Sequence, residues 1–241
     1  MVLGAADFFD LTTTALADLF EDTMYVWEAI DRVGPYIESH FANGLQPNVA
    51  TLNVHPSVVF GDAPIFVGKG TKIHPSVYIE GPAIIGKNCE IRHGAYVRAN
   101  TILADGAIVG HASETKNAVL LEHAAAPHFA YVGDSILGQR VNLGAGTKLS
   151  NVPVNSKSDS ESSRRTIAIQ VDSQRYDTGL TKFGAIIGDD VEVGCNTVMN
   201  PGVLIGPRTL VYALSSVPAG YTPADRIVKL RQTRQIVERR G

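Results

Sequence analysis

Residues 67–114 read VGKGTK IHPSVY IEGPAI IGKNCE IRHGAY VRANTI LADGAI VGHASE, which are eight consecutive groups of six residues. Each group opens on an aliphatic residue and carries a small or narrow residue four places later, as in Ile91 followed by Ala95. The same repeat returns between Ile187 and Val217. A period of six fits neither the 3.6-residue turn of a helix nor the two-residue alternation of a lone strand. It indicates a parallel β-helix, in which short strands joined by tight turns stack into a prism.

The residue types within each group of six support the same interpretation. The aliphatic residue is expected to point inward, the small residue to fit a corner, and Gly, Asn or Asp to occupy turns with positive φ. We therefore predict a mainly β protein, a left-handed parallel β-helix with three hexapeptides per triangular coil. Cys89 and Cys195 are interpreted as packed thiols at small corner positions, rather than as a disulfide or a metal pair.

Three regions follow from where the repeat is present. Residues 1–45 lack it and show apolar residues at roughly helical spacing, which predicts a helical cap over the open end of the prism. Residues 46–220 form the β-helix, with a polar insertion at about 152–180 whose alternating second half predicts a hairpin. Residues 221–241 are basic and are predicted to form a short C-terminal amphipathic helix.

Composition limits the classes of function. The formal net charge of −3 gives no general reason to expect a nucleic-acid or membrane partner. No apolar run approaches about 20 residues and no signal peptide opens the chain, so a cytoplasmic protein is expected. The first forty residues are acidic and the last seventeen are basic. These segments are either solvated helix faces or surfaces that pair end to end between subunits.

Polar side chains gather where the repeat loses its rhythm, between Glu114 and Asn151. We interpret residues 115–130 as an irregular stretch that leaves the solenoid, which is a common setting for a site. A histidine there, such as His128, can act as a general base near neutral pH. Taken alone, His128 is better explained as a structural histidine.

The runs HFAYVGD (128–134), VNLGAGT (141–147) and KFGAIIGDD (182–190) resemble, in order and spacing, motifs of one family. The family is the acetyltransferase half of bifunctional N-acetylglucosamine-1-phosphate uridylyltransferase/glucosamine-1-phosphate acetyltransferase. The resemblance runs from Arg98 to Asn151 and resumes at Lys182. It implies acetyl transfer from acetyl-CoA to the amine of a hexosamine-1-phosphate, with glucosamine-1-phosphate preferred, in a homotrimer that needs no metal.

The resemblance also assigns roles to single residues. His128 would be the general base that deprotonates the sugar amine. The substrate-binding residues would be Arg98, Glu114, Lys116, Tyr131, Asn142, Asn151 and Lys182. Cys195 and Ala213 lie on the late coils, where acetyl-CoA would bind. The residue types suit this chemistry independently, because a sugar phosphate needs fixed cations and an amine nucleophile needs a base and hydrogen-bond acceptors.

The chain also departs from the family in two ways. No G-x-G-T-x-M motif is present, so uridylyl transfer is not expected here and a separate nucleotidyltransferase could be a partner. The insertion at 152–180 is longer than in common bacterial members and is more similar to archaeal enzymes that combine a sugar-1-phosphate nucleotidylyltransferase with an acetyltransferase.

Two alternative functions stay open. A γ-type carbonic anhydrase uses the same prism and binds zinc through three histidines across a trimer interface, and His123 and His128 have its H-x4-H spacing. The upstream position that should hold the third histidine is Lys87 in this chain, so metal content would decide. The other alternative is a non-catalytic trimeric subunit that docks on a nucleotidyltransferase through its charged termini.

Overall fold

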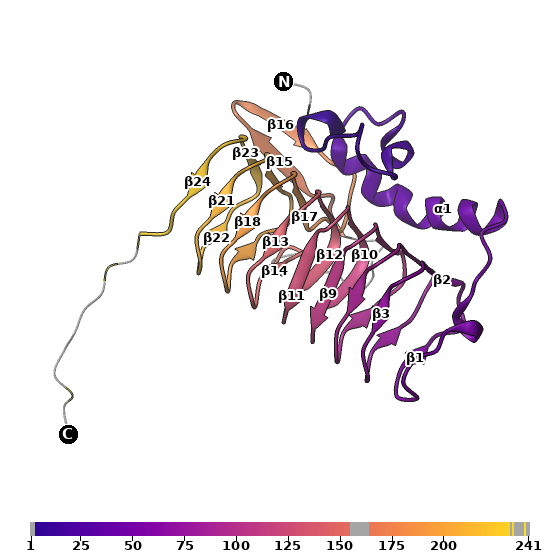
Figure 1. Cartoon of the computed structure of the whole chain (residues 1–241). Helices are drawn as coiled ribbons and strands as arrows, with labels where there is room; N and C mark the ends of the chain where they lie inside the picture. Colours follow the sequence, from indigo (N-terminus) through magenta and orange to yellow (C-terminus); the bar gives the residue numbers. More distant parts are fainter. Residues whose placement is uncertain (1–2, 155–163, 232, 234–238, 240–241) are drawn as a thin grey trace.

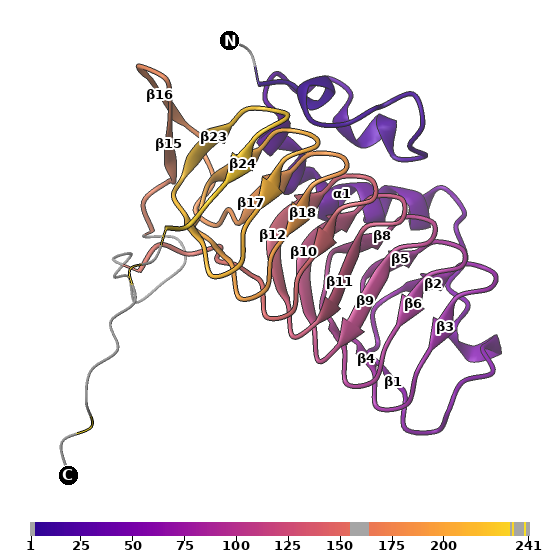
Figure 2. The same cartoon turned by 60° about the vertical axis from the view of Figure 1, so that its left-hand side comes forward.

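The computed structural model describes residues 3–154, 164–231, 233 and 239, most of which wind into a prism of stacked coils (Figure 1, Figure 2). Each coil places short strands on three faces. In one coil, β5 (Ala83–Ile85) lies on face I, β6 (Glu90–Ile91) on face II and β7 (Tyr96–Val97) on face III. The chain then returns to face I as β8 (Thr101–Leu103), which pairs in parallel with β5. The predicted parallel β-helix of hexapeptide repeats is confirmed.

The remaining strands continue the same three faces. Face I also contains β2 (Ile65–Val67), the second halves of β10 (Glu114–Leu120) and β12 (Tyr131–Leu137), β17 (Ala185–Ile187), β20 (Val203–Ile205) and β23 (Gly220–Thr222). Face II also contains β3 (Lys72–Ile73), β9 (Ile108–His111), β11 (Ala125–His128), β13 (Asn142–Leu143), β18 (Glu192–Val193), β21 (Leu210–Val211) and β24 (Ile227–Val228). Face III also contains β1 (Val59–Phe60), β4 (Tyr78–Ile79), the first halves of β10 and β12, β14 (Lys148–Leu149), β19 (Val198–Met199) and β22 (Ser216–Val217).

Strands β10 and β12 bend from face III to face I, and we call this corner of the prism the III–I edge. Asn100, Asn117 and Asp134 stand at this edge in successive coils, with φ of 59°, 46° and 46°. Asn and Asp are among the few residues with a side chain that tolerate this left-handed conformation, which explains their recurrence at the corner.

The irregular spacing after residue 114 comes from two shortened coils and not from a loop. Glu114 lies opposite Tyr96, 18 residues earlier, whereas Tyr131 lies opposite Glu114 and Lys148 opposite Tyr131 at a spacing of 17. The residue is lost at the III–I edge. Before the edge, Thr115 pairs with Val97, 18 residues earlier, and after it Ala118 pairs with Thr101, 17 residues earlier. The expectation that residues 115–130 leave the solenoid is therefore wrong, because β10 and β11 keep most of them in the coils.

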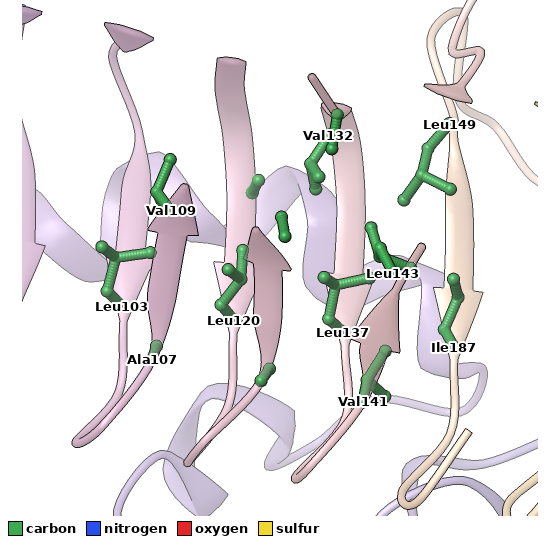
Figure 3. Packing of buried hydrophobic residues seen from close by; sticks show 14 of the residues in the cluster. Leu103, Ala107, Val109, Leu120, Val132, Leu137, Val141, Leu143, Leu149 and Ile187 are labelled. Carbon is green, nitrogen blue, oxygen red and sulfur yellow. The ribbon is translucent and has the colours of Figure 1, made fainter. Parts of the chain in front are cut away.

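Inward side chains form rows that run along the prism. Leu103, Leu120, Leu137 and Ile187 occupy one such row, since each is the register partner of the next, and all are buried (Figure 3). Burying each of these side chains contributes roughly 1.5–3 kcal/mol relative to leaving it exposed. The repeat in the sequence is therefore the repeat of the core.

The two cysteines differ in their surroundings. Cys89 is buried in the core, as predicted, whereas Cys195 is exposed. The prediction for Cys195 is wrong because this residue follows the inward Val193 by two places and not by four, which puts it outside the small corner position.

The N-terminal segment is helical, as predicted, but it covers face I instead of the open end of the prism (Figure 1). Among the described residues it contains helix α1 (Ala29–Ala42) and three 3-10 turns, namely Ala5–Asp7, Ala17–Phe20 and Val26–Glu28. A further 3-10 turn, Val49–Thr51, follows the segment, and Val49 packs against the core inside the prism. Its apolar side chains form one buried cluster with Ile102, Val119, Ile136, Ile186 and Leu204, which point outward from face I. An apolar outer face needs a cover, and this requirement places the segment along the side of the prism.

The polar insertion forms the predicted hairpin, with β15 (Ala168–Val171) antiparallel to β16 (Gln174–Asp177). Tyr176 of the hairpin contacts the stacked rings of Tyr25 and Trp27, so the hairpin packs on the N-terminal segment. The serine-rich residues 155–163 lie outside the described residues.

The coils extend beyond residue 220, where the β-helix was predicted to end. Residues 220–222 and 227–228 form β23 and β24, which pair with β20 and β21. The predicted C-terminal helix is therefore wrong at residues 227–228, since Ile227 joins a sheet, and most of the tail that follows lies outside the described residues.

Candidate active site

Face III carries a column of polar side chains that leads to the III–I edge. Glu114 and Lys116 stand two residues apart on β10 and so share its outer side, while Thr115 between them is buried. Tyr131 lies opposite Glu114 on the next coil, and the amide of Arg98 donates to the Thr115 carbonyl at 2.8 Å from the coil before. The register thus gathers four of the predicted substrate residues.

Arg98 is held by acidic and aromatic neighbours. Its Nη1 donates to Glu114 Oε1 at 2.9 Å, and its Nε lies 3.9 Å from Glu80 Oε2. The Tyr96 ring centroid lies 5.6 Å from the Arg98 guanidinium carbon, and Tyr96 Oη donates to Glu80 at 3.0 Å. The hydrogen bond to Glu114 raises the pKa of Arg98. Nε itself is buried without a hydrogen-bond partner among the described residues, so the Glu80 carboxylate balances its charge without a direct hydrogen bond.

Asp134 joins several site residues at the III–I edge. It is only 4% exposed, and its carboxylate accepts hydrogen bonds from Asn117 Nδ2 at 3.0 Å and from Asn151 Nδ2. The Lys116 ammonium lies 3.8 Å from the same carboxylate. A buried carboxylate is costly unless it is paired and hydrogen-bonded, so these three partners and Asp134 fix one another.

Tyr131 lies back over its own strand. A Cβ added at Gly133 would stand 2.5 Å from Tyr131 Oη, so the missing side chain at position 133 makes room for the phenol. A hydrogen bond with the Asn151 side chain holds the phenol near Asp134. Burial, followed by the charges of Asp134 and Glu114, raises the pKa of Tyr131. The phenol therefore stays protonated at neutral pH and can donate a hydrogen bond.

A cavity of about 380 Å³ opens at this edge. Helix α1, the III–I edge and the end of the insertion each form one side of it. Its lining includes Asp31, Asn100, Lys116, Asn117, Asp134 and Lys182. Lys182 comes from the far end of the insertion, so the structure brings the predicted Lys182 and Lys116 into one cavity.

Four predicted residues lie elsewhere, on face II and its edge with face III. His128 ends β11, is exposed, and pairs in register with His111 of β9. Asn142 and Ala213 line a second hollow of about 280 Å³ on face II. Cys195 lies beside it, since its carbonyl accepts the Leu214 amide at 2.9 Å. One chain therefore presents two separate groups of predicted residues.

Several residues of the first group were not predicted as site residues. Glu80 and Tyr96 could have been found from the register alone, because they stand one coil before Arg98 and Glu114. Asn100 and Asn117 also follow from the column of corner residues. Asp31 carries no such signal, since its helix lies outside the repeat.

Among the described residues, no group of three or more His, Cys, Asp or Glu side chains is arranged to hold a metal ion. His123 occupies a corner position with φ of 60°. Within the described part of this chain, His123 and His128 therefore do not belong to a three-residue group that could hold zinc. In that same part, no helix is both long enough and apolar enough to span a membrane.

Comparison with known proteins defines the family. The fold and its repeat make this chain a hexapeptide-repeat β-solenoid protein. The family model described as GMPPB C-terminal domain matches residues 79–212, which is more than half of the chain. The chain therefore belongs to the GMPPB C-terminal domain family.

Curated relatives agree with the resemblance found in the sequence. A "Bifunctional sugar-1-phosphate nucleotidylyltransferase/acetyltransferase" of Sulfurisphaera tokodaii is 36% identical over 103 residues, covering 43% of this chain and 24% of that protein. A "Bifunctional protein GlmU" of Methanococcus maripaludis is 35% identical over 104 residues, covering 43% and 23%. The resemblance is thereby confirmed, and the chain spans about a quarter of the length of the curated relatives it matches.

The solved structures that this chain matches share little sequence with it. An Arabidopsis UDP-N-acetylglucosamine acyltransferase is 14% identical with a TM-score of 0.43, covering 72% of this chain and 69% of that one. A GDP-perosamine N-acetyl transferase from Caulobacter crescentus, solved with CoA and GDP-perosamine, is 18% identical with a TM-score of 0.30, covering 77% and 57%.

Proposed function

We propose that this protein transfers the acetyl group of acetyl-CoA to the amine of a hexosamine-1-phosphate, with glucosamine-1-phosphate as the first candidate. The observation that carries the proposal is the gathering of six residues from several coils along face III and the III–I edge. These residues are Arg98, Glu114, Lys116, Tyr131, Asn151 and Lys182. The names of the curated relatives, which combine sugar-1-phosphate and acetyl transfer, support the same chemistry.

The cations of this edge suit a phosphate ester. Lys116 and Lys182 line the cavity, and Arg98 lies in the column of polar side chains on face III that leads to it. Neighbouring carboxylates, such as Glu114 beside Arg98, hold these long side chains in place before a ligand arrives. Such preorganisation lowers the entropic cost of binding.

His128 is the proposed general base. The amine nitrogen attacks the thioester carbonyl carbon while the imidazole takes a proton from that nitrogen. The carbon–sulfur bond then breaks, the acetyl group stays on the nitrogen, and CoA leaves as a thiol after its sulfur takes up a proton. A neutral imidazole nitrogen can accept the proton, and the imidazolium can return it to the leaving sulfur. No metal is required for this step.

The active site is completed between copies of the chain in this proposal. His128 and Asn142 lie on a different part of the prism from the cavity, so a homotrimer would bring them to the III–I edge of a neighbouring copy. Exposed apolar side chains near His128 and on face II support association, with Phe129 53%, Leu210 39%, Tyr212 47% and Leu214 54% exposed. Acetyl-CoA would then bind along the hollow that Asn142 and Ala213 line, next to Cys195.

The proposal is tested with a panel of amino sugars. The protein is incubated with acetyl-CoA and glucosamine-1-phosphate, galactosamine-1-phosphate or the unphosphorylated sugars, and the N-acetylated products are identified by mass spectrometry. We expect product from at least one hexosamine-1-phosphate and little from the unphosphorylated sugars. No product from any sugar phosphate contradicts the proposal, and a stable inactive trimer would instead favour a non-catalytic subunit.

A further inference from the structure

Helix α1 is fastened directly over the cavity. Asn117 Nδ2 donates to the carbonyl of Ile30 at 3.4 Å, which ties the first turn of the helix to the III–I edge. One turn later, a Cβ added at Gly34 would stand 3.1 Å from Asn100 Nδ2. At Gly34 the helix therefore lies so close to the III–I edge that a larger residue would crowd Asn100.

This close approach accounts for an unfavourable sequence. Gly34 and Pro35 both lie inside α1, where glycine costs about 1 kcal/mol relative to alanine and proline costs more. Gly34 is buried against Asn100, so the glycine serves the contact with the prism. A helix that only shielded the apolar side chains of face I would have no need to meet the polar edge this closely.

Asp31 is the charged residue that α1 brings to the cavity. Among the described residues, its carboxylate has no hydrogen bond or ion pair, although Lys116, Lys182 and Asp134 line the same cavity from β10, the insertion and β12. Asp31 is exposed, but its carboxyl is partly desolvated at the cavity, and this desolvation, followed by the charge of Asp134, raises its pKa. The cavity thus has an acceptor that the protein itself leaves unused.

We propose that Asp31 accepts hydrogen bonds from ring hydroxyl groups of the bound sugar phosphate, which makes α1 part of the substrate site. This inference rests on the proposed function. The phosphate is repelled by the carboxylates of Asp31 and Asp134 and is drawn to the lysines, so the uncharged ring faces α1. A carboxylate is an acceptor only, and ring hydroxyls are donors that it can select.

An acidic residue at position 31 also has a purely structural explanation, and the experiment must distinguish it from substrate binding. It lies in the first turn of α1, where an acidic side chain stabilises a helix through its dipole. Asp31→Asn keeps the size and removes the charge. A helix effect would lower the melting temperature and leave the kinetics unchanged, whereas substrate recognition changes the KM of the sugar alone.

The experiment compares wild type, Asp31→Asn and the control Glu38→Gln, which changes another acidic residue of α1 that does not line the cavity. We expect Asp31→Asn to raise the KM for the hexosamine-1-phosphate roughly 10- to 100-fold, as for loss of a hydrogen bond to a charged group. The kcat, the KM for acetyl-CoA and the circular dichroism spectrum should stay within about twofold of wild type, and Glu38→Gln should match wild type.

A deoxy-sugar series identifies the hydroxyl groups involved. Wild type should lose affinity for the 3-deoxy, 4-deoxy or 6-deoxy analogue of its substrate, and Asp31→Asn should no longer distinguish that analogue from the parent sugar. An active wild type with an unchanged KM in Asp31→Asn overturns this inference and leaves the proposed function intact. A wild type that acetylates no hexosamine-1-phosphate overturns both.

Discussion

Replacing Asp134 by asparagine tests the organisation of the III–I edge. The carboxylate accepts hydrogen bonds from Asn117 and Asn151 and pairs with Lys116, whereas an amide offers one acceptor oxygen and no charge. Asparagine tolerates the φ of 46° at this position, so the backbone can be kept. At least one donor therefore loses its acceptor, and Lys116 loses its counter-charge.

The magnitude follows from these contacts. Loss of a hydrogen bond to a charged group costs about 1.5–3 kcal/mol. For a chain of this size, each kcal/mol lowers the melting temperature by about 2–4 °C, which gives a fall of about 3–12 °C for Asp134→Asn. Lys116 and Asn151 also lose their fixed positions, so the KM for the sugar phosphate should rise about 10-fold or more.

Thermal unfolding and steady-state kinetics measure both effects, and Asp190→Asn is the matched control. Asp190 pairs with Arg140 at 2.5 and 2.7 Å, but both side chains are half-exposed and lie away from the cavity. Exposed ion pairs contribute about 0–1 kcal/mol, so Asp190→Asn should lower the melting temperature by at most about 4 °C without changing the KM. If Asp134→Asn behaves like Asp190→Asn, the role given to Asp134 is wrong.

Two other substitutions test separate parts of the account. Gly133→Ala should push the Tyr131 ring away from its strand, because the new Cβ would stand 2.5 Å from Tyr131 Oη. We expect the KM for the sugar phosphate to rise about 10-fold. An unchanged KM would show that Tyr131 does not bind substrate. Ile136→Ala removes a fully buried side chain between face I and the N-terminal segment and should cost about 2–5 kcal/mol in the free energy of unfolding, measured by chemical denaturation. The half-exposed Ile227→Ala is its control, and equal stability of the two variants would contradict the packing of that segment on face I.

The β-helix could be predicted because its repeat is a local steric requirement, met again in every coil. The place of the N-terminal segment could not be read from the repeat, because it depends on the outward side of face I. The evidence lay in residues such as Ile102 and Ile136, which are apolar at positions where an exposed strand would carry polar side chains. The two shortened coils were misread as a loop because the loss of a single residue at the III–I edge shifts the repeat without interrupting the strands.

The site was predictable to the extent that it follows the register. Arg98, Glu114 and Tyr131 recur on successive coils of one face, so their proximity follows from the coil length. Asp31 could not be found, since its position depends on tertiary packing of a segment outside the repeat.

The decisive experiment for acetyl transfer with His128 as the general base measures the release of CoA from acetyl-CoA. Wild type and His128→Ala are each assayed with glucosamine-1-phosphate and with galactosamine-1-phosphate. A general base typically contributes about 10²–10⁴-fold, so wild type should turn over and His128→Ala should lose at least about 100-fold in kcat while remaining folded. A wild type without turnover, or a His128→Ala variant with the kcat of wild type, would contradict the account.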